Sequence, residues 1–129
     1  MGKILIVDDA KINRMILEQI LKDQYEILEA EDGLDAINVF SENKELIDVV
    51  LLDAVMPVSS GYDFLAEARR QGWLEHTSVI MVSTDNTEPA VRRALEGGAI
   101  DYISRPFSAQ TVLRRVEAAR RRNVKETQE

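Results

Sequence analysis

The stretch "VVLLDAVMP", Val49 to Pro57, places four consecutive apolar residues directly before an aspartate, Asp53. An apolar run without polar interruption predicts a strand that is covered on both faces, as in the parallel sheets of α/β proteins. A carboxylate at the end of such a strand is costly to bury without a partner. The stretch therefore indicates a fold class and a site at the carboxyl end of the strand.

Similar short segments, apolar and rich in β-branched residues, recur along the chain. We predict five strands, at residues 3–7, 25–28, 47–52, 78–82 and 99–103. Segments with helical spacing separate them, and the first apolar stripe consists of Ile12, Met15, Ile16 and Ile20. Five β-then-α units predict an α/β domain with a doubly wound, five-stranded parallel sheet and helices on both faces.

Length and composition restrict the possible classes of protein. The chain has 129 residues, which fits one domain at 1–122, followed by a C-terminal tail or the start of a linker at 123–129. The absence of cysteine excludes disulfides and thiolate metal sites and fits a cytoplasmic location. No segment approaches the roughly 20 apolar residues that span a bilayer, so we expect no membrane contact. The net charge of −7 argues against direct nucleic-acid binding.

Acidic residues follow two of the predicted strands. Asp8 and Asp9 end the first strand in "ILIVDDA", and Asp53 ends the third. If these strands are neighbours, three carboxylates converge where such sheets bind ligands, and they repel one another unless a cation lies among them. Oxygen ligands favour Mg²⁺, for which Mn²⁺ could substitute. The alternative is that Asp8 or Asp9 simply caps the next helix.

Polar residues also end the fourth and fifth strands. Ser83 and Thr84 end the fourth, and Arg105 follows the fifth, where Pro106 restricts its backbone to extended geometry. Separately, these are ordinary helix caps and a solvated arginine. Beside three carboxylates and a metal, a hydroxyl and a cation indicate a phosphoryl-transfer site, in which one carboxylate is the nucleophile and forms an acyl phosphate.

An ordered set of motifs now resembles the receiver domain of bacterial two-component response regulators, in particular chemotaxis regulators. The motifs are "ILIVDD", "AEDGLDA", "LLDAVMPVSSG", the hydroxyl of Ser83 and "GGAIDYISRPF", and the resemblance spans about residues 2–122. It implies a flavodoxin-like sheet with strand order 2-1-3-4-5. It also implies that Asp53 accepts a phosphoryl group from a sensor histidine kinase or phosphotransfer protein.

The resemblance further implies roles for individual residues. Asp9 and Asp53 would bind Mg²⁺ directly, Asp8 largely through water, and the backbone carbonyl of Val55 would complete the protein ligands. Ser83 would be the switch hydroxyl, and Tyr102 the switch aromatic.

Two positions depart from the family pattern. Arg105 stands where receivers usually have lysine, and arginine is a planar fork rather than a compact point charge. Thr84 stands where receivers often have alanine, and its bulk restricts access to the phosphoacceptor. Two hypotheses therefore stay open: a working switch with altered kinetics, and a degenerate receiver that acts as a phosphorylation-independent protein-interaction module.

The resemblance also implies partners on a second surface. The fourth helix, fifth strand and fifth helix would change shape on phosphorylation and contact a downstream output domain or target protein. Asp101, Arg114 and Arg115 lie on these elements and could pair across a homodimer or within one chain.

We expect no enzyme activity beyond self-phosphorylation and self-dephosphorylation. An aspartate-nucleophile small-molecule phosphatase is the alternative, although haloacid-dehalogenase-like enzymes need an acid where this chain has Val55. A nucleotide- or flavin-binding module lacks its usual glycine-rich motif here.

Overall fold

Strands and helices alternate along the chain in the computed structural model, which describes residues 2–56 and 59–128, with side chains as far as Arg122. The strands are β1 (Lys3–Val7), β2 (Glu26–Ala30), β3 (Ile47–Asp53), β4 (Ser78–Ser83) and β5 (Asp101–Ser104). The helices are α1 (Lys11–Leu21), α2 (Gly33–Asn43), α3 (Gly61–Arg70), α4 (Glu88–Gly97) and α5 (Ala109–Gln128), with a 3-10 turn η1 at Trp73–Glu75.

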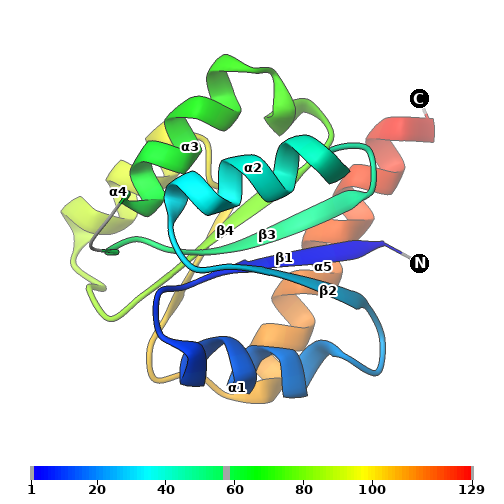
Figure 1. The fold of residues 1–129 in the computed structure, drawn as a ribbon. Coiled ribbons are helices and arrows are strands. Elements are labelled where there is room, and N and C mark those ends of the chain that lie inside the picture. The colour runs from blue at the N-terminus through cyan, green and yellow to red at the C-terminus, as the bar shows by residue number, and fades with distance from the viewer. Residues whose placement is uncertain (1, 57–58, 129) are drawn as a thin grey trace.

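The five strands form one parallel sheet in the order β2-β1-β3-β4-β5 (Figure 1). This confirms the predicted fold class and strand order. β1 and β3 are adjacent, and their register pairs Ile4 with Val49 and Val7 with Leu52. The carboxyl ends of these two central strands therefore lie side by side.

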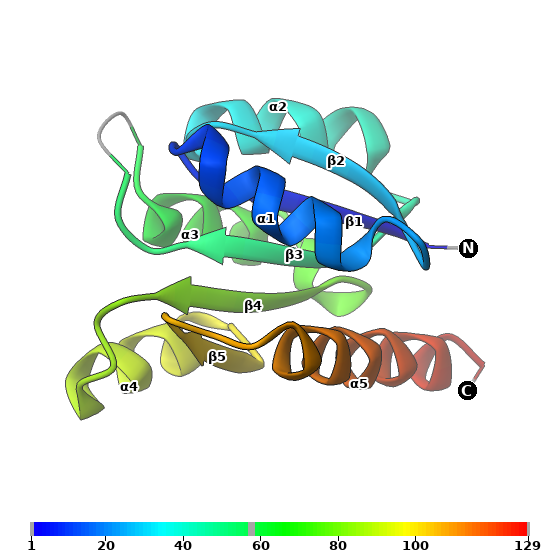
Figure 2. The same cartoon turned by 90° about the horizontal axis from the view of Figure 1, so that it is seen from below.

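Helices cover both faces of the sheet, with α1 and α5 on one side and α2, α3 and α4 on the other (Figures 1 and 2). In β1, Ile4 and Ile6 pack toward α1 and α5, whereas Leu5 and Val7 pack toward the opposite layer. Because successive side chains alternate between two buried faces, every position of a central strand needs an apolar residue. This explains the uninterrupted apolar run that precedes Asp53.

Two strands start later than predicted because backbone hydrogen bonds from the preceding helix ends reach the predicted strand, and β2 to β5 also end one or two residues later than predicted. β2 starts at Glu26, one residue later than predicted, since the Tyr25 amide still donates to the Leu21 carbonyl at 3.1 Å. β5 starts at Asp101, two residues later, because Gly98 ends α4 in a left-handed conformation with φ 119°. The Ala99 amide then donates back to Ala94 at 3.0 Å. Local hydrogen bonds at the helix ends thus shift both strands.

The predicted apolar stripe of α1 is mostly wrong. Ile12, Met15 and Ile16 are 62%, 48% and 46% exposed, while Leu17 and Leu21 are buried against the sheet. The helix carries more apolar residues than its sheet-facing side can bury, so spacing alone does not select the buried row. Three large apolar side chains consequently lie on the outside of α1.

Side chains cap the starts of α3 and α4 near the carboxyl edge of the sheet. Ser60 and Asp63 form a reciprocal capping box at the start of α3. Thr87 caps α4 and accepts a hydrogen bond from the Ala90 amide, with Pro89 in the first turn as predicted. No helix within the described residues has the length and apolar character to cross a membrane.

Candidate functional site

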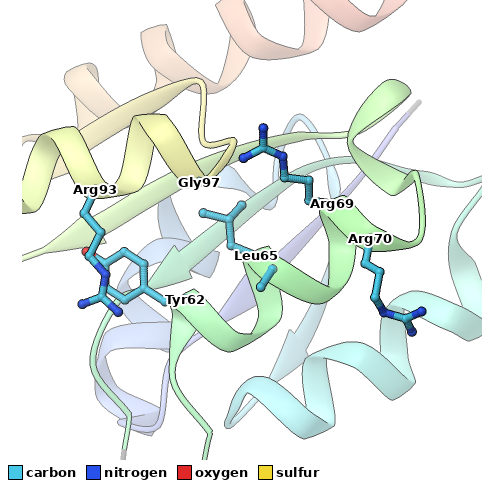
Figure 3. A pocket seen from close by; sticks show the side chains of 7 residues that line it. Tyr62, Leu65, Arg69, Arg70, Arg93 and Gly97 are labelled. Atoms are coloured by element: carbon cyan, nitrogen blue, oxygen red, sulfur yellow. The ribbon is translucent and has the colours of Figure 1, made fainter.

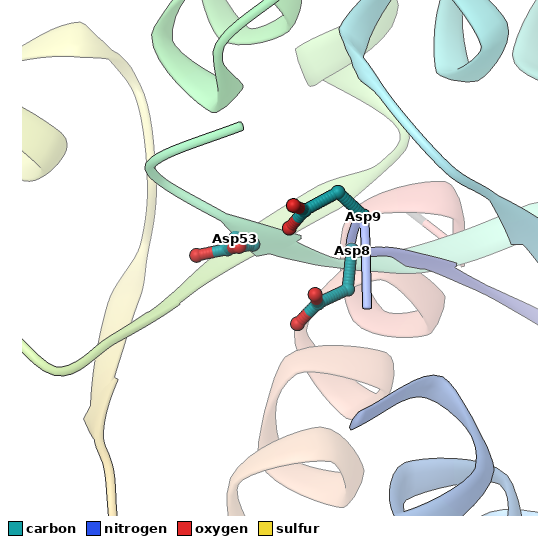
Figure 4. A group of neighbouring side chains, drawn as sticks. All are labelled: Asp8, Asp9 and Asp53. Carbon is teal, nitrogen blue, oxygen red and sulfur yellow. The ribbon is translucent and has the colours of Figure 1, made fainter. Parts of the chain in front are cut away.

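Three carboxylates converge at the carboxyl edge of the sheet (Figure 4). Asp8 and Asp9 follow β1, and Asp53 is the last residue of β3. One carboxylate oxygen from each lies within 4.8 Å of the other two. The pairing of Val7 with Leu52 places Asp8 and Asp53 at the same level of the edge, so the predicted convergence of all three side chains is met.

Asp8 is the most enclosed member of this cluster, at 1% exposure. Its Oδ1 accepts the Ala10 amide at 2.9 Å and the side-chain amide of Asn13 at 3.4 Å. Its Oδ2 accepts a hydrogen bond from the guanidinium of Arg105. Both oxygens of this buried carboxylate therefore have donors, as a buried charge requires.

Asp53 is also buried, at 8% exposure, but it has much weaker support. Burial and, to a lesser extent, the neighbouring Asp8 charge raise its pKa to about 6, against the opposing effects of Arg105 and the Val55 amide. That amide lies 3.4 Å from Oδ1, which is long for a hydrogen bond. Asp53 is thus a carboxylate with little local compensation.

The donor set fits a hard divalent cation. Three carboxylates supply only oxygen, within a spread that allows one ion to contact more than one of them. Mg²⁺ takes oxygen ligands at about 2.0–2.1 Å and keeps several waters, so it does not need a complete protein cage. A cation here would remove the mutual repulsion that destabilises the charged form of Asp53.

The hydroxyl predicted for the site lies at the end of β4. Asp53 pairs in register with Val82, so Ser83 is one residue further along at the same edge. Ser83 is buried, and its Oγ accepts the Asp85 amide at 3.1 Å. Thr84 is exposed, as is the side chain of Val55, at 73%. The side chains of Thr84 and Val55 are therefore not enclosed within the site.

Arg105 reaches the site from the end of β5. Its amide donates to the Ser83 carbonyl at 2.9 Å, and its peptide bond to Pro106 is cis. The guanidinium is largely buried and pairs with Asp8. The predicted phosphate cation is therefore at the site, and in the structure a carboxylate of the cluster is its partner.

Tyr102 lies on β5 with its hydroxyl outside the acidic cluster. The hydroxyl donates to the backbone carbonyl of Asp85. Because the amide of Asp85 also donates to Ser83, one residue of the β4–α4 loop connects the predicted switch hydroxyl and the predicted switch aromatic.

Two residues of α1 support the site but escaped the sequence analysis. Arg14 donates to the Asp8 carbonyl at 2.6 Å and to the Glu29 carboxylate at 2.9 Å. Asn13 donates to the carboxylate of Asp8. Asn13 and Arg14 lie in the first turn of the helix that follows "DD". Because that turn lies close to the strand end, these two polar residues could have been predicted to contact the site.

Asp101 and Arg115, considered for a homodimer, pair within the chain. The intramolecular alternative is therefore the one the structure shows for these two charges. The charge of Asp101 is therefore already paired with Arg115 of the same chain, without a second protein chain.

A separate cleft of about 420 Å³ lies between α3 and α4 (Figure 3). Leu65 and Gly97 line it together with exposed arginines, and the guanidinium carbon of Arg93 lies 3.7 Å from the centroid of the Tyr62 ring. None of the three clustered carboxylates lines this cleft, so it is distinct from the acidic site.

Comparisons with known proteins agree with this geometry. Residues 4–117 match the family model described as "response regulator receiver domain". A chemotaxis protein CheY from Listeria monocytogenes is 39% identical over 121 residues, covering 92% of this chain and 98% of that protein. The phosphate regulon transcriptional regulatory protein PhoB of Escherichia coli is 34% identical, and the alignment covers 93% of this chain but 52% of PhoB.

A solved structure adds a chemically informative relative. The crystal structure of the CheX-CheY-BeF3-Mg²⁺ complex from Borrelia burgdorferi superimposes with a TM-score of 0.85 at 31% identity, covering 91% of this chain and 87% of that one. These matches support the resemblance to chemotaxis-regulator-like receivers.

Proposed function

The chain belongs to the family of response regulator receiver domains, and on this basis we propose that it is a phosphoacceptor signalling domain. Asp53 takes a phosphoryl group from a sensor histidine kinase or a phosphotransfer protein. The observation that carries the proposal is the convergence of Asp8, Asp9 and Asp53 around a buried, poorly compensated nucleophile. The Mg²⁺-containing complex of a CheY relative supports the same chemistry.

The transfer forms an oxygen–phosphorus bond at Asp53 and breaks the nitrogen–phosphorus bond of a phosphohistidine. The imidazole nitrogen keeps the electron pair of the broken bond and later takes a proton from solvent. A pKa of about 6 leaves Asp53 mostly ionised at neutral pH, as a nucleophile must be. Arg105 donates hydrogen bonds to the transferred group and balances its charge.

Asp9 and Asp53 would hold Mg²⁺ directly, Asp8 through water, and Val55 through its carbonyl. When bound, the ion supplies positive charge that stabilises the phosphoryl oxygens.

The signal leaves the site through the β4–α4 loop. A phosphoryl group on Asp53 attracts the Ser83 hydroxyl. The hydroxyl then no longer accepts the hydrogen bond from the Asp85 amide. Loss of that hydrogen bond releases the loop and weakens the hydrogen bond that the Tyr102 hydroxyl donates to the Asp85 carbonyl. The face formed by α4, β5 and α5 then changes shape, as a shift between two populated arrangements.

Exposed apolar side chains surround the acidic edge and suit a protein donor. Ile12 at the start of α1, Leu34 at the start of α2 and Val55 after β3 are 62%, 57% and 73% exposed. These positions all lie at the ends of the elements that meet the carboxyl edge of the sheet. Exposed apolar residues at the sheet edge that carries the reactive carboxylate fit a protein partner that presents a phosphohistidine.

Further parts of the proposal concern the downstream pathway. The α4-β5-α5 face contacts an output domain or a separate target protein, and it is also where a homodimer would form. The domain acts in the cytoplasm, which the cysteine-free sequence fits.

The test is incubation with acetyl phosphate and Mg²⁺, followed by intact-mass measurement. We expect the wild-type protein to gain the mass of one phosphoryl group and Asp53→Asn to gain none. Asp48→Asn is the matched control, because Asp48 lies at the opposite end of the same strand. An adduct on Asp53→Asn, or none on the wild type under conditions that label a known receiver, would contradict the proposal.

A second candidate is a receiver that does not switch by phosphorylation. The buried pair between Arg105 and Asp8 favours it, because the cation expected to serve the phosphoryl group is already engaged. In that case the wild type stays unmodified, and Arg105→Lys restores the adduct.

A further inference from the structure

Arg105 has an unusual position relative to the acidic cluster. Within the described part of the chain, it is the basic side chain that forms an ion pair with one of the three clustered carboxylates. Arg14 also approaches Asp8, but it donates to the backbone carbonyl and pairs with Glu29 instead. The charge balance of the cluster therefore depends on Arg105.

The contact occupies a carboxylate oxygen that would otherwise be open to a water bound to the metal. Oδ1 of Asp8 already accepts the Ala10 amide and Asn13, and Arg105 takes Oδ2. The guanidinium charge also acts on Asp53, where it opposes the effects of burial and of Asp8. A divalent cation that binds among the same carboxylates is therefore repelled by the Arg105 charge. Both oxygens of Asp8 are also already hydrogen-bonded.

We propose that Arg105 is an exchangeable internal counter-ion, which competes with the divalent cation for the acidic cluster and leaves Asp8 when the cation binds. The proposal rests on the metal-dependent function proposed above and adds a regulatory role for this residue. Once released, the guanidinium is free to meet the incoming phosphoryl group. Metal binding thereby prepares the cation that the transfer uses.

Arginine suits this role for a chemical reason. Its planar fork presents several donors along two edges, so it binds a carboxylate with directional hydrogen bonds as well as charge. A lysine ammonium is a compact, strongly hydrated charge that holds a single carboxylate less specifically. The arginine at this position therefore predicts weaker metal binding than the same site with lysine.

The first experiment measures Mg²⁺ and Mn²⁺ affinity by titration calorimetry, without any phosphodonor. The proteins are the wild type, Arg105→Met, Arg105→Lys and the control Arg70→Met. Arg70 carries the same charge but pairs with Glu67 at the far end of α3. We expect Arg105→Met to bind metal about tenfold more tightly than the wild type, within the 5- to 150-fold range typical of coupled sites.

The control and the lysine variant test the specificity of the effect. Arg70→Met should bind as the wild type does, and Arg105→Lys should lie between the wild type and Arg105→Met. Equal affinities of the wild type and Arg105→Met, or weaker binding by Arg105→Met, would overturn the proposal. An equal gain in metal affinity in Arg70→Met would show that the effect comes from net charge alone, and this too would overturn the proposal.

A second measurement uses the wild-type protein alone, in case Arg105→Met folds poorly. The Nε–H resonance of Arg105 is followed by NMR during a Mg²⁺ titration. Release from Asp8 predicts a shift of this resonance and faster exchange with water, saturating together with metal binding. A resonance that stays unchanged while metal saturates the site would refute the exchange.

These readouts separate the inference from the proposed function. If the affinity series holds but acetyl phosphate leaves no adduct, the counter-ion role stands and the phosphoacceptor role fails. If Asp53 is phosphorylated while the metal affinities of the wild type and Arg105→Met are equal, the phosphoacceptor role stands and the counter-ion role fails.

Discussion

Asp8 and Asp53 show how two neighbouring carboxylates acquire different chemistry. Asp8 has donors on both oxygens, whereas Asp53 has one long contact from the Val55 amide and lies beside the charge of Asp8. Hydrogen bonds to a carboxylate favour its charged form, and burial next to a like charge disfavours it. Asp8 therefore has donors on both of its oxygens already, and Asp53 is the carboxylate that gains most from a new partner.

The raised pKa of Asp53 predicts a pH dependence of stability in metal-free protein. The folded state holds the proton more tightly than the unfolded chain, because the pKa moves from 3.8 to about 6. The resulting stabilisation is complete below about pH 4 and disappears as the pH rises through 6. Relative to the wild type, Asp53→Asn should therefore gain about 1–3 kcal/mol of unfolding free energy between pH 4 and pH 7.5.

Urea unfolding of both proteins in the presence of a chelator, across this pH range, measures the difference. A difference between Asp53→Asn and wild type that does not change with pH would show that the Asp53 charge is well compensated in the fold.

At the level of elements, α1 shows the limit of hydrophobic periodicity. Its buried row contains Leu17 and Leu21, while Met15 and Ile16 are exposed. Both rows satisfy helical spacing, and the contact with the sheet decides between them. An apolar outer row costs little in stability and provides contact area for a partner.

We predict that single truncations separate the two rows of α1. Leu17→Ala should lower the unfolding free energy by about 2–5 kcal/mol, because it leaves a cavity against the sheet. Ile16→Ala, one position away on the exposed side, should change it by no more than about 0.5 kcal/mol. Chemical denaturation of both variants checks this. Comparable losses in the two would mean that Ile16 belongs to the core.

At the level of the whole molecule, the parallel topology gathers the site from distant parts of the chain. The end of β3 also contacts the start of α3 closely. A Cβ added to Gly61 would lie 2.2 Å from the Asp53 carbonyl oxygen, which is backbone and has no room to move. The absence of a side chain at Gly61 therefore lets α3 dock directly on the strand that ends in Asp53.

Gly61→Ala should consequently disturb both stability and the site. We expect a loss of about 1–3 kcal/mol in unfolding free energy, as for other overpacked positions, together with slower phosphorylation by acetyl phosphate. Gly97→Ala is the matched control, because its Cβ would meet only the flexible end of the Leu65 side chain, at 2.9 Å. Thermal unfolding and the mass assay compare the two. An equal effect of both substitutions would contradict the close-approach argument.

Much of this protein follows from local patterns in the chain. The alternation of apolar runs with helical spacing predicts the five strands and the doubly wound sheet, since each pattern reflects burial on two faces or on one. The aspartates at two strand ends predict the acidic cluster, because parallel strands end at a common edge. Family motifs supply the strand order and the expected roles of Ser83, Tyr102 and Arg105.

Only the tertiary structure decides which groups pair inside that frame. Arg105 and Asp8 are 97 positions apart, and nothing local indicates that the guanidinium engages a carboxylate of the cluster. The same holds for the link from Ser83 through Asp85 to Tyr102 and for the buried row of α1. The physical reason is that burial and charge pairing depend on neighbours across the fold, whereas periodicity records only the neighbours along one element.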